Sequence, residues 1–313
     1  MSIISKILRG VVPPICTPFT QDYEVDEKSL RRLINHLLDG GVHGIFALGS
    51  TSEVGYLTDR NRAEILRITV DEVSGKVPVV AGVIDTTTLR VNEHVRAGIA
   101  AGVDGFVLTA PFYARVNQAE ISLHFKKVKE ACGSIPLYAY DIPALVNGVK
   151  LETNTVLNLA VEGVIAGLKD SSGIDSAMRA VMLGRRERKL DEFVVLTGSE
   201  LTVDTALFSG ADGVVPGIGN VDPAGYVRIF NYVKENNLEA ARKEQERLFK
   251  MFDLVSVGLP RGLGANSSAY GAFKESLKLL GIIEDARTAP PSIQLNDKEI
   301  AEIKTYLVGA GLI

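Results

Sequence analysis

Residues 102–143 read GVDGFVLTAPFYARVNQAEISLHFKKVKEACGSIPLYAYDIP, and this stretch contains one complete strand–helix–strand pattern. Two β-branched apolar runs, 103–110 and 135–142, are each bounded by Gly or Pro, which is typical of buried strands. The segment between them, 119–131, places apolar residues three and four apart, as a one-sided helix does. A strand, a helix and a second strand in this order favour parallel pairing with a right-handed crossover.

The same alternation continues along the chain. Short apolar runs separated by helical patterns occur at residues 10–18, 42–50, 77–83, 103–110, 135–142, 164–169, 193–198 and 211–217. A weak repeat supports the count, because GVHG (41–44), GVDG (102–105) and GADG (210–213) each end a helical pattern and lead into an apolar run. Singly, each of these is also an ordinary helix-stop signal. Eight strands predict an α/β fold, a (β/α)8 TIM barrel.

Beyond Pro223 the pattern becomes wholly helical, over residues 226–252, 269–280 and 297–307. No low-complexity linker separates these helices from the rest of the chain. We therefore predict a barrel that forms the catalytic core over residues 1–222, with an all-helical C-terminal extension over residues 223–313 packed on it.

Composition and charge exclude several classes of partner. The 34 Lys and Arg residues against 38 Asp and Glu residues give a formal charge of -4, which offers no electrostatic footprint for nucleic acid or an anionic membrane. No apolar run approaches the length of a membrane span, and residues 1–10 lack the apolar core of a secretory signal. Cys16 and Cys132 lie far apart in the sequence, which argues against a disulfide framework. We expect a cytoplasmic protein.

The active site of such a barrel lies at the carboxyl ends of the strands. The four histidines fall on predicted helices or before a strand, so neither a histidine-ligated metal site nor a histidine base is supported; they are His36, His43, His94 and His124. We therefore expect no metal ion at the site.

Lys169 ends the run VIAGLK (164–169), and alternation places Gly167 and Lys169 on one face. If that face lines the barrel, Gly167 leaves space for a ligand and the amine is desolvated. Desolvation lowers the pKa of a lysine and frees its lone pair to attack a carbonyl. A strand-end lysine that pairs with Asp170 or another carboxylate fits the position equally well.

Other strand ends supply hydroxyls and backbone N–H groups. Tyr138 and Tyr140 share one face of their run, and either phenol could carry protons beside the lysine, because the spacing does not distinguish them. The stretch GSTS (49–52) combines backbone N–H groups with hydroxyls and could cradle a carboxylate. The stretch GIGN (217–220) could also cradle an anion, although close backbone packing explains its glycines equally well.

Together these pieces resemble the dihydrodipicolinate synthase/N-acetylneuraminate lyase family of class I pyruvate-dependent aldolases. The markers, in order along the chain, are PICTPF (14–19), GSTSE (49–53), PFY (111–113), YDIP (140–143) and GLKD (167–170). The resemblance implies that Lys169 is the Schiff-base lysine. It also implies that Tyr140, directly before Asp-Ile-Pro, is the tyrosine that transfers protons.

The resemblance assigns further residues. Ser50 and Thr51 match the pair that holds the pyruvate carboxylate, and Val215 matches a position whose backbone faces pyruvate. Tyr113 matches a tyrosine that some members insert into the proton relay of a neighbouring subunit. The implied partners are pyruvate and an aldehyde, and the implied assembly is a homotetramer built from dimers.

The chain departs from the family pattern at positions that bear on which substrate it uses. Synthases of lysine biosynthesis carry an arginine shortly after the Pro of YDIP to bind the carboxylate of the aldehyde partner. Here ALVNG (144–148) has none and looks more like the loop of sialic acid lyases and sugar acid aldolases. Gly198 and Glu200 are expected to contact the substrate, but Leu201 follows where sialic acid lyases carry a second acid. Gly217 replaces a serine of those lyases.

Ser52 also replaces a glycine that is common in the family's stretch at 49–53, which we call the signature loop. This replacement leaves the loop geometry open but keeps the hydroxyls of Ser50 and Thr51. The resemblance thus implies a Schiff-base lyase that cleaves or forms a C–C bond between pyruvate and an aldehyde and that needs no metal or organic cofactor. The expected substrate is a 2-keto-3-deoxy sugar acid. The alternatives are a 4-hydroxy-tetrahydrodipicolinate synthase that uses aspartate semialdehyde, a Schiff-base sugar-acid dehydratase, and a non-catalytic member that binds a 2-oxo acid.

Overall fold

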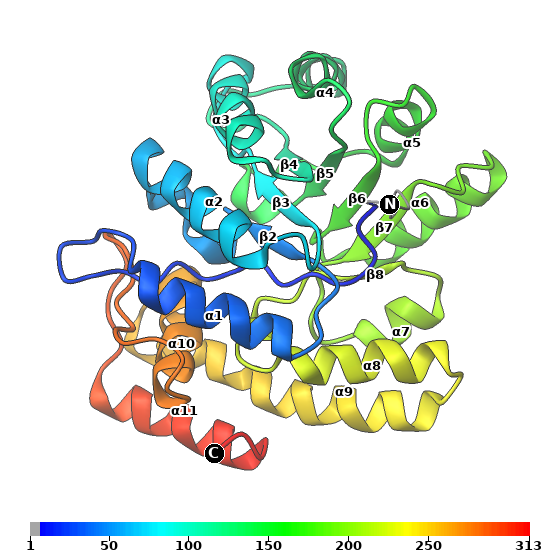
Figure 1. Cartoon of the computed structure of the whole chain (residues 1–313). Coiled ribbons are helices and arrows are strands. Elements are labelled where there is room, and N and C mark those ends of the chain that lie inside the picture. Colours follow the sequence, from blue (N-terminus) through cyan, green and yellow to red (C-terminus); the bar gives the residue numbers. More distant parts are fainter. Residues whose placement is uncertain (1–6) are drawn as a thin grey trace.

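The computed structural model describes residues 7–313 and contains the eight predicted strands (Figure 1). Each lies within its predicted run, except that β6 extends one residue further, to Asp170. The strands are β1 (Gly10–Val11), β2 (Ile45–Ala47), β3 (Val79–Gly82), β4 (Gly105–Thr109), β5 (Leu137–Asp141), β6 (Gly167–Asp170), β7 (Val194–Thr197) and β8 (Gly213–Val214). The expectation about a secretory signal in residues 1–10 falls largely outside the described residues.

All strand pairs are parallel, and the strand order is β1-β8-β7-β6-β5-β4-β3-β2. The two ends of this order meet, because the Ile15 N–H donates to Phe46 O at 2.9 Å and the Phe46 N–H donates to Pro13 O at 3.0 Å. The segment after β1 therefore pairs with β2 and closes the sheet. The predicted (β/α)8 barrel is confirmed.

Helices cover the outside of the sheet (Figure 1). They are α1 (Glu27–Asp39), α2 (Asp59–Val73), α3 (Thr88–Ala101), α4 (Gln118–Cys132), α5 (Thr153–Val161), α6 (Asp175–Glu187), α7 (Val203–Phe208) and α8 (Pro223–Lys234). In α4, Asn117 and Glu120 form a capping box, while Ile121, Phe125 and Val128 are buried on one face. Burial stabilises each such side chain by roughly 1.5–3 kcal/mol, which fixes the face that α4 turns to the sheet.

The remaining helices are α9 (Leu238–Phe252), α10 (Ala265–Leu279) and α11 (Asp297–Gly309). The continuous helix expected over residues 226–252 is in fact two, because Asn236 adopts a left-handed φ of 58° and ends the run of α-helical backbone. Helix α9 consequently folds back along α8 (Figure 1). Helix α8 itself packs against α7 and β1 and is thus in contact with the barrel. The boundary between a catalytic core over residues 1–222 and an extension over residues 223–313 stays a prediction.

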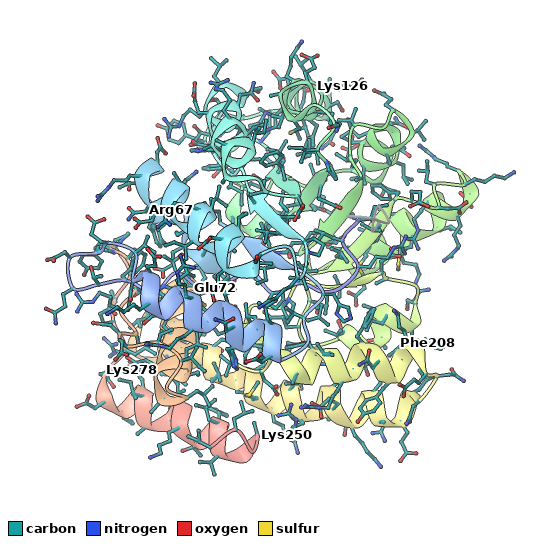
Figure 2. All side chains as sticks on the ribbon, viewed as in Figure 1. Arg67, Glu72, Lys126, Phe208, Lys250 and Lys278 are labelled. Atoms are coloured by element: carbon teal, nitrogen blue, oxygen red, sulfur yellow. The ribbon has the colours of Figure 1, made fainter. Side chains whose placement is uncertain are left out.

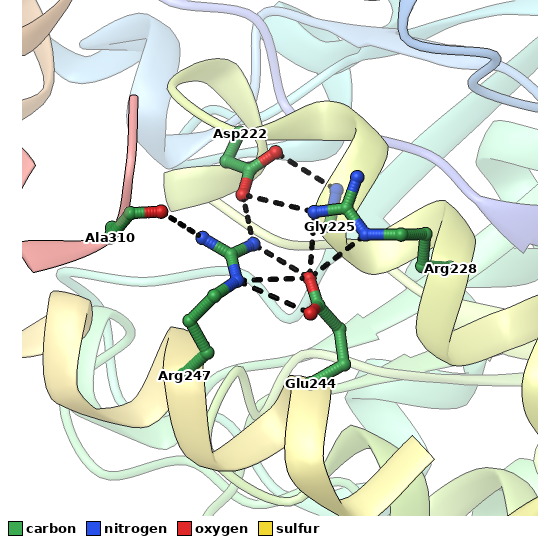
Figure 3. A network of polar contacts seen from close by, with 6 residues as sticks. All are labelled: Asp222, Gly225, Arg228, Glu244, Arg247 and Ala310. Carbon is green, nitrogen blue, oxygen red and sulfur yellow. Dashed lines mark hydrogen bonds and ion pairs between the residues drawn. The ribbon is translucent and has the colours of Figure 1, made fainter. Parts of the chain in front are cut away.

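A charged network ties the C-terminal helices to the barrel (Figure 3). Asp222 caps the N-terminus of α8 by accepting the Gly225 N–H at 2.9 Å, and it also pairs with Arg247 on α9. Arg247 in turn pairs with Glu244 and donates to Ala310 O at 3.0 Å. The end of α11, helix α9 and the loop after β8 are thereby held together.

The barrel interior is packed with buried side chains and is not a pore, whereas Arg67, Lys126 and Lys250 lie on the outer helices (Figure 2). Strand register arranges the interior in layers: Val107 is opposite Tyr138, and one layer closer to the carboxyl ends Thr109 is opposite Tyr140 and Tyr140 is opposite Lys169. The upper layer is where functional groups gather. None of the helices within residues 7–313 combines the length and the hydropathy needed to cross a bilayer.

Candidate active site

Three of the predicted residues come together at the carboxyl end of the barrel. Lys169 is only 6% exposed, and its Nζ lies 3.9 Å from the centroid of the Tyr140 ring and 5.0 Å from that of Phe46. The Tyr140 hydroxyl is 3.4 Å from Ser50 Oγ. Asp170 lies on the opposite face of β6, where it accepts the Ser172 N–H at 2.8 Å, so the lysine contacts aromatic rings rather than its neighbour.

Tyr138 and Tyr140 share a face of β5 but lie at different depths. The Tyr138 hydroxyl accepts the Leu8 N–H at 3.1 Å near the amino end of the barrel, and burial raises the pKa of this phenol. Tyr140 is therefore the tyrosine beside Lys169. Gly167 does not leave space for a ligand, contrary to expectation, because a Cβ there would lie 2.4 Å from a methyl carbon of Val194 and 3.0 Å from Tyr138.

The signature loop forms a 3₁₀ helix over Ser50–Ser52. The Ser52 hydroxyl donates to Ile15 O at 2.5 Å, and the Thr17 hydroxyl donates to Ser52 O at 2.9 Å. Ser52 thus anchors the loop to the segment after β1. Thr51 is 8% exposed, and Ser50 faces Tyr140.

Glu200 follows β7 and turns its carboxylate toward the loop after β8, where Oε1 accepts the Ile218 N–H at 2.6 Å. Burial raises the pKa of the Glu200 carboxyl to about 7, although this N–H and the charge of Lys169 act to lower it. The stretch 217–220 was expected to cradle an anion of a ligand, and its backbone instead binds the Glu200 carboxylate. A Cβ at Gly217 would lie 3.1 Å from the Phe273 ring and 3.3 Å from Glu200, so glycine permits this packing.

The other predicted residues surround this group. Gly198 is closely packed, since a Cβ there would lie 1.9 Å from Ser171 Oγ, and Val215 is buried in the barrel interior. Tyr113 does not join the group within one chain. It is 89% exposed in the loop after β4, with a left-handed φ of 77° that is unusual for a bulky residue.

A cavity of about 230 Å³ opens beside Ser50. Its wall is largely apolar and includes Ile142, Leu145 and Val146. Asn266 and Tyr270 of α10 complete it, and sequence reasoning missed both of them. Their contribution depends on where a helix nearly 100 residues from Lys169 packs, and no local pattern encodes that.

The histidines lie outside this group. His36 Nε2 is 3.1 Å from Asn220 O, His94 Nε2 is 2.8 Å from Asp85 Oδ2, and His124 Nδ1 is 2.8 Å from Thr88 Oγ1. Within residues 7–313, no group of three or more His, Cys, Asp or Glu side chains is arranged to hold a metal ion.

This arrangement suits chemistry at a carbonyl group. A buried primary amine can attack a carbonyl carbon, and a phenol beside it can donate and accept the protons that such an addition requires. Hydroxyls and backbone N–H groups of the signature loop can bind an anionic group of the same molecule.

Comparison with known proteins assigns a family to the chain. A sequence model described as the dihydrodipicolinate synthetase family matches residues 7–309. The 4-hydroxy-tetrahydrodipicolinate synthase of Porphyromonas gingivalis is 33% identical over 278 residues, covering 88% of this chain and 92% of that protein. An uncharacterized DapA-like lyase of Halobacterium salinarum is 31% identical over 287 residues, covering 90% and 91%.

Solved structures agree with this. A prophage protein of the dihydrodipicolinic acid synthase family from E. coli K12, determined in complex with pyruvate, has a TM-score of 0.90 and 27% identity, covering 98% of this chain and 99% of its own. Dihydrodipicolinate synthase from Bacteroides thetaiotaomicron has a TM-score of 0.89 and 29% identity, covering 96% and 98%. The similarity extends over the barrel and the C-terminal helices alike.

Proposed function

The chain belongs to the dihydrodipicolinate synthetase family, a family of pyruvate-dependent aldolases and lyases, and on that premise we propose that Lys169 is its Schiff-base lysine. The observation that carries the proposal is the placement of Lys169 Nζ, 3.9 Å from the Tyr140 ring centroid, on a residue that is only 6% exposed. A buried amine beside a phenol has both the reactivity and the proton donor that the step needs.

In the proposed reaction, Lys169 Nζ attacks the keto carbon of the substrate to form a carbinolamine. The Tyr140 hydroxyl protonates the departing oxygen, and water leaves as the C=N bond of the iminium forms. The iminium accepts the electron pair of the C3–C4 bond as that bond breaks, while Tyr140 removes the proton of the C4 hydroxyl. Aldehyde leaves, C3 is protonated, and water hydrolyses the iminium to pyruvate and free Lys169.

Ser50 and Thr51 bind the 1-carboxylate of the substrate in this proposal. Ser50 Oγ lies 3.4 Å from the Tyr140 hydroxyl, so a carboxylate on the loop has its neighbouring keto carbon beside Tyr140 and Lys169. Gly198 and Val215 line the same end of the barrel, and their backbone groups are the proposed contacts of the substrate. Glu200 is proposed to bind a substrate hydroxyl.

The proposed substrate is a 2-keto-3-deoxy sugar acid. The stretch 144–148 offers no cation for a second carboxylate, and Lys150, the next cation along the chain, is paired with Asp141 and donates to Leu151 O at 2.9 Å. The wall formed by Leu145 and Val146 is apolar. This part of the site therefore offers no free cation for the second carboxylate of aspartate semialdehyde, whereas the neutral chain of a sugar acid needs none.

The second candidate is 4-hydroxy-tetrahydrodipicolinate synthase, which condenses pyruvate with aspartate semialdehyde. The observation in its favour is that relatives over most of the chain carry that name, including the Porphyromonas gingivalis protein at 33% identity and one from Syntrophus aciditrophicus at 29% identity over 98% of this chain.

One assay separates the candidates. Pyruvate release and loss of water are measured with a panel of 2-keto-3-deoxy sugar acids and N-acetylneuraminate. Condensation is measured with pyruvate and aspartate semialdehyde, and Lys169→Ala is the control throughout. We expect release from a sugar acid that the variant abolishes. Condensation without release would establish the synthase instead, and loss of water without C–C cleavage would establish a dehydratase.

The proposed assembly is a homotetramer built from dimers. The exposed position of Tyr113 supports it, because a bulky aromatic residue held at φ 77° without burial in its own chain is suited to enter a partner's site. Sedimentation velocity tests the assembly, and a monomer at the concentration of the activity assay would contradict it.

A further inference from the structure

A buried ion pair joins the signature loop to the C-terminal helices. Glu53, the residue after the Ser50–Ser52 turn, pairs through Oε1 with Nζ of Lys274 on α10. Both side chains are 0% exposed. The partners are more than 200 residues apart in the sequence, so the pair fixes one part of the fold against another.

Both members of this pair have further partners in the protein. Besides Glu53, Lys274 Nζ donates to Arg287 O at 2.9 Å and lies 4.2 Å from the centroid of the Phe19 ring. The second carboxylate oxygen of Glu53 accepts the Ala289 N–H at 2.7 Å. The segment after α10 thus contacts both partners and holds the pair in one geometry.

The backbone at Glu53 links the ion pair to the turn that carries the Ser50 and Thr51 hydroxyls. Glu53 adopts a left-handed φ of 60° between two 3₁₀ turns, Ser50–Ser52 and Val54–Tyr56, and its N–H donates to Ser50 O at 2.9 Å. A shift of the Glu53 side chain would therefore rotate the turn that carries Ser50 and Thr51. Buried ion pairs add little net stability, because desolvation offsets their attraction, so stability alone does not account for the pair.

We propose that Glu53 and Lys274 are positioning residues, and that their ion pair sets the position of the Ser50 and Thr51 hydroxyls and hence the affinity for the substrate carboxylate. This proposal rests on the proposed function, in which these hydroxyls bind that carboxylate. It makes α10 part of the active-site framework, together with Asn266 and Tyr270 of the same helix, which line the cavity.

The test compares Glu53→Gln, Lys274→Met, the double variant and Glu299→Gln. Glu299 pairs with Arg261 elsewhere in the C-terminal helices and is also buried, so it controls for damage to that region. We expect KM for the 2-oxo acid substrate to rise about tenfold or more in each variant of the pair, with kcat changed much less, and Glu299→Gln to leave KM unchanged.

The double variant separates positioning from stability. Removing both charges avoids a lone buried ion, so thermal stability is expected to recover relative to the single variants. KM is expected to stay high, because the two substituted side chains cannot form an ion pair and so cannot restore the anchor. Recovery of KM together with stability, or an unchanged KM in all three variants, would overturn the proposal.

Hydrogen–deuterium exchange tests the anchor without any substrate, using the full chain. Exchange over residues 50–56 is expected to be faster in Glu53→Gln and in the double variant than in the wild-type protein or Glu299→Gln. Equal exchange in all of them would overturn the anchor even if the enzyme is active. If exchange is faster in the variants but the wild-type protein forms no adduct with pyruvate, the anchor stands and the proposed function is wrong. In that case the role of the ion pair in substrate affinity is contradicted together with the function.

Discussion

Tyr140 and Lys169 are register partners on β5 and β6, and this pairing places Lys169 Nζ against the face of the Tyr140 ring, 3.9 Å from its centroid. A cation over an aromatic face is stabilised by roughly 0.5–2 kcal/mol, so the ring holds the lysine side chain in place independently of the hydroxyl. The two parts of the tyrosine can therefore be separated by mutation.

Tyr140→Phe keeps the ring and removes the proton donor. We expect kcat to fall by about 10²–10⁴-fold, the usual contribution of a positioned acid–base group, with little change in the free energy of unfolding. Tyr138→Phe is the matched control. It leaves the Leu8 N–H without its partner, so it should cost about 1–3 kcal/mol of stability and leave kcat unchanged. Equal effects of the two variants on kcat would contradict the assignment.

Ser50→Ala and Thr51→Val remove the hydroxyls proposed to hold the substrate carboxylate. A hydrogen bond to a charged group contributes about 1.5–3 kcal/mol, so each variant should raise KM for the 2-oxo acid by about tenfold or more. Ser50→Ala should also lower kcat, because Ser50 Oγ lies 3.4 Å from the Tyr140 hydroxyl. Steady-state kinetics at saturating second substrate measure both constants, and a KM unchanged in both variants would remove the hydroxyl pair from the site.

Glu200 gives a pH-dependent prediction. Burial raises the pKa of its carboxyl to about 7 in the folded protein, from an ordinary value of 4.5. The folded state therefore binds this proton more tightly than the unfolded chain. The stabilisation that results is fully present below about pH 4.5 and is lost as the pH rises through about 7.

Glu200→Gln abolishes this dependence. The free energy of unfolding of the variant minus that of the wild-type protein should thus be larger at about pH 8 than at about pH 5. Denaturant titrations at the two pH values measure the difference. The same difference at both values would mean that Glu200 ionises normally.

Tyr113→Phe tests whether the exposed tyrosine serves a partner subunit. We expect kcat to fall about tenfold or more, while the free energy of unfolding within one subunit changes by less than about 0.5 kcal/mol because the side chain is 89% exposed. Tyr23→Phe is a control at another partly exposed tyrosine with a left-handed φ. An unchanged kcat in Tyr113→Phe would place that residue outside the reaction.

Local pattern was sufficient for the barrel, but for Lys169 it left a strand-end ion pair equally open, and the resemblance supplied the Schiff-base assignment. Each strand is a short apolar run between Gly or Pro, and such runs are readable because parallel strands are buried on both faces. Alternation alone could not choose between Tyr138 and Tyr140, which differ in depth rather than in face. The choice needed the resemblance, and the strand register agrees with it, because Tyr138 is opposite Gly167 whereas Tyr140 is opposite Lys169.

Long-range packing accounts for what was missed or misread. The role of Gly167 depends on Val194 of the next strand, and the anion held by the loop after β8 is Glu200 from the loop after β7. The pair of Glu53 and Lys274 joins segments more than 200 residues apart. A single sequence carries periodicity within elements but not the partners that the elements acquire on folding.

The most direct test of the account is borohydride reduction in the presence of pyruvate, followed by peptide mass spectrometry. We predict that the mass of a reduced pyruvate adduct appears on the peptide that contains Lys169, and that Lys169→Ala shows no adduct. An adduct on another lysine, or no adduct at saturating pyruvate in the wild-type protein, would contradict the proposal that Lys169 forms the Schiff base.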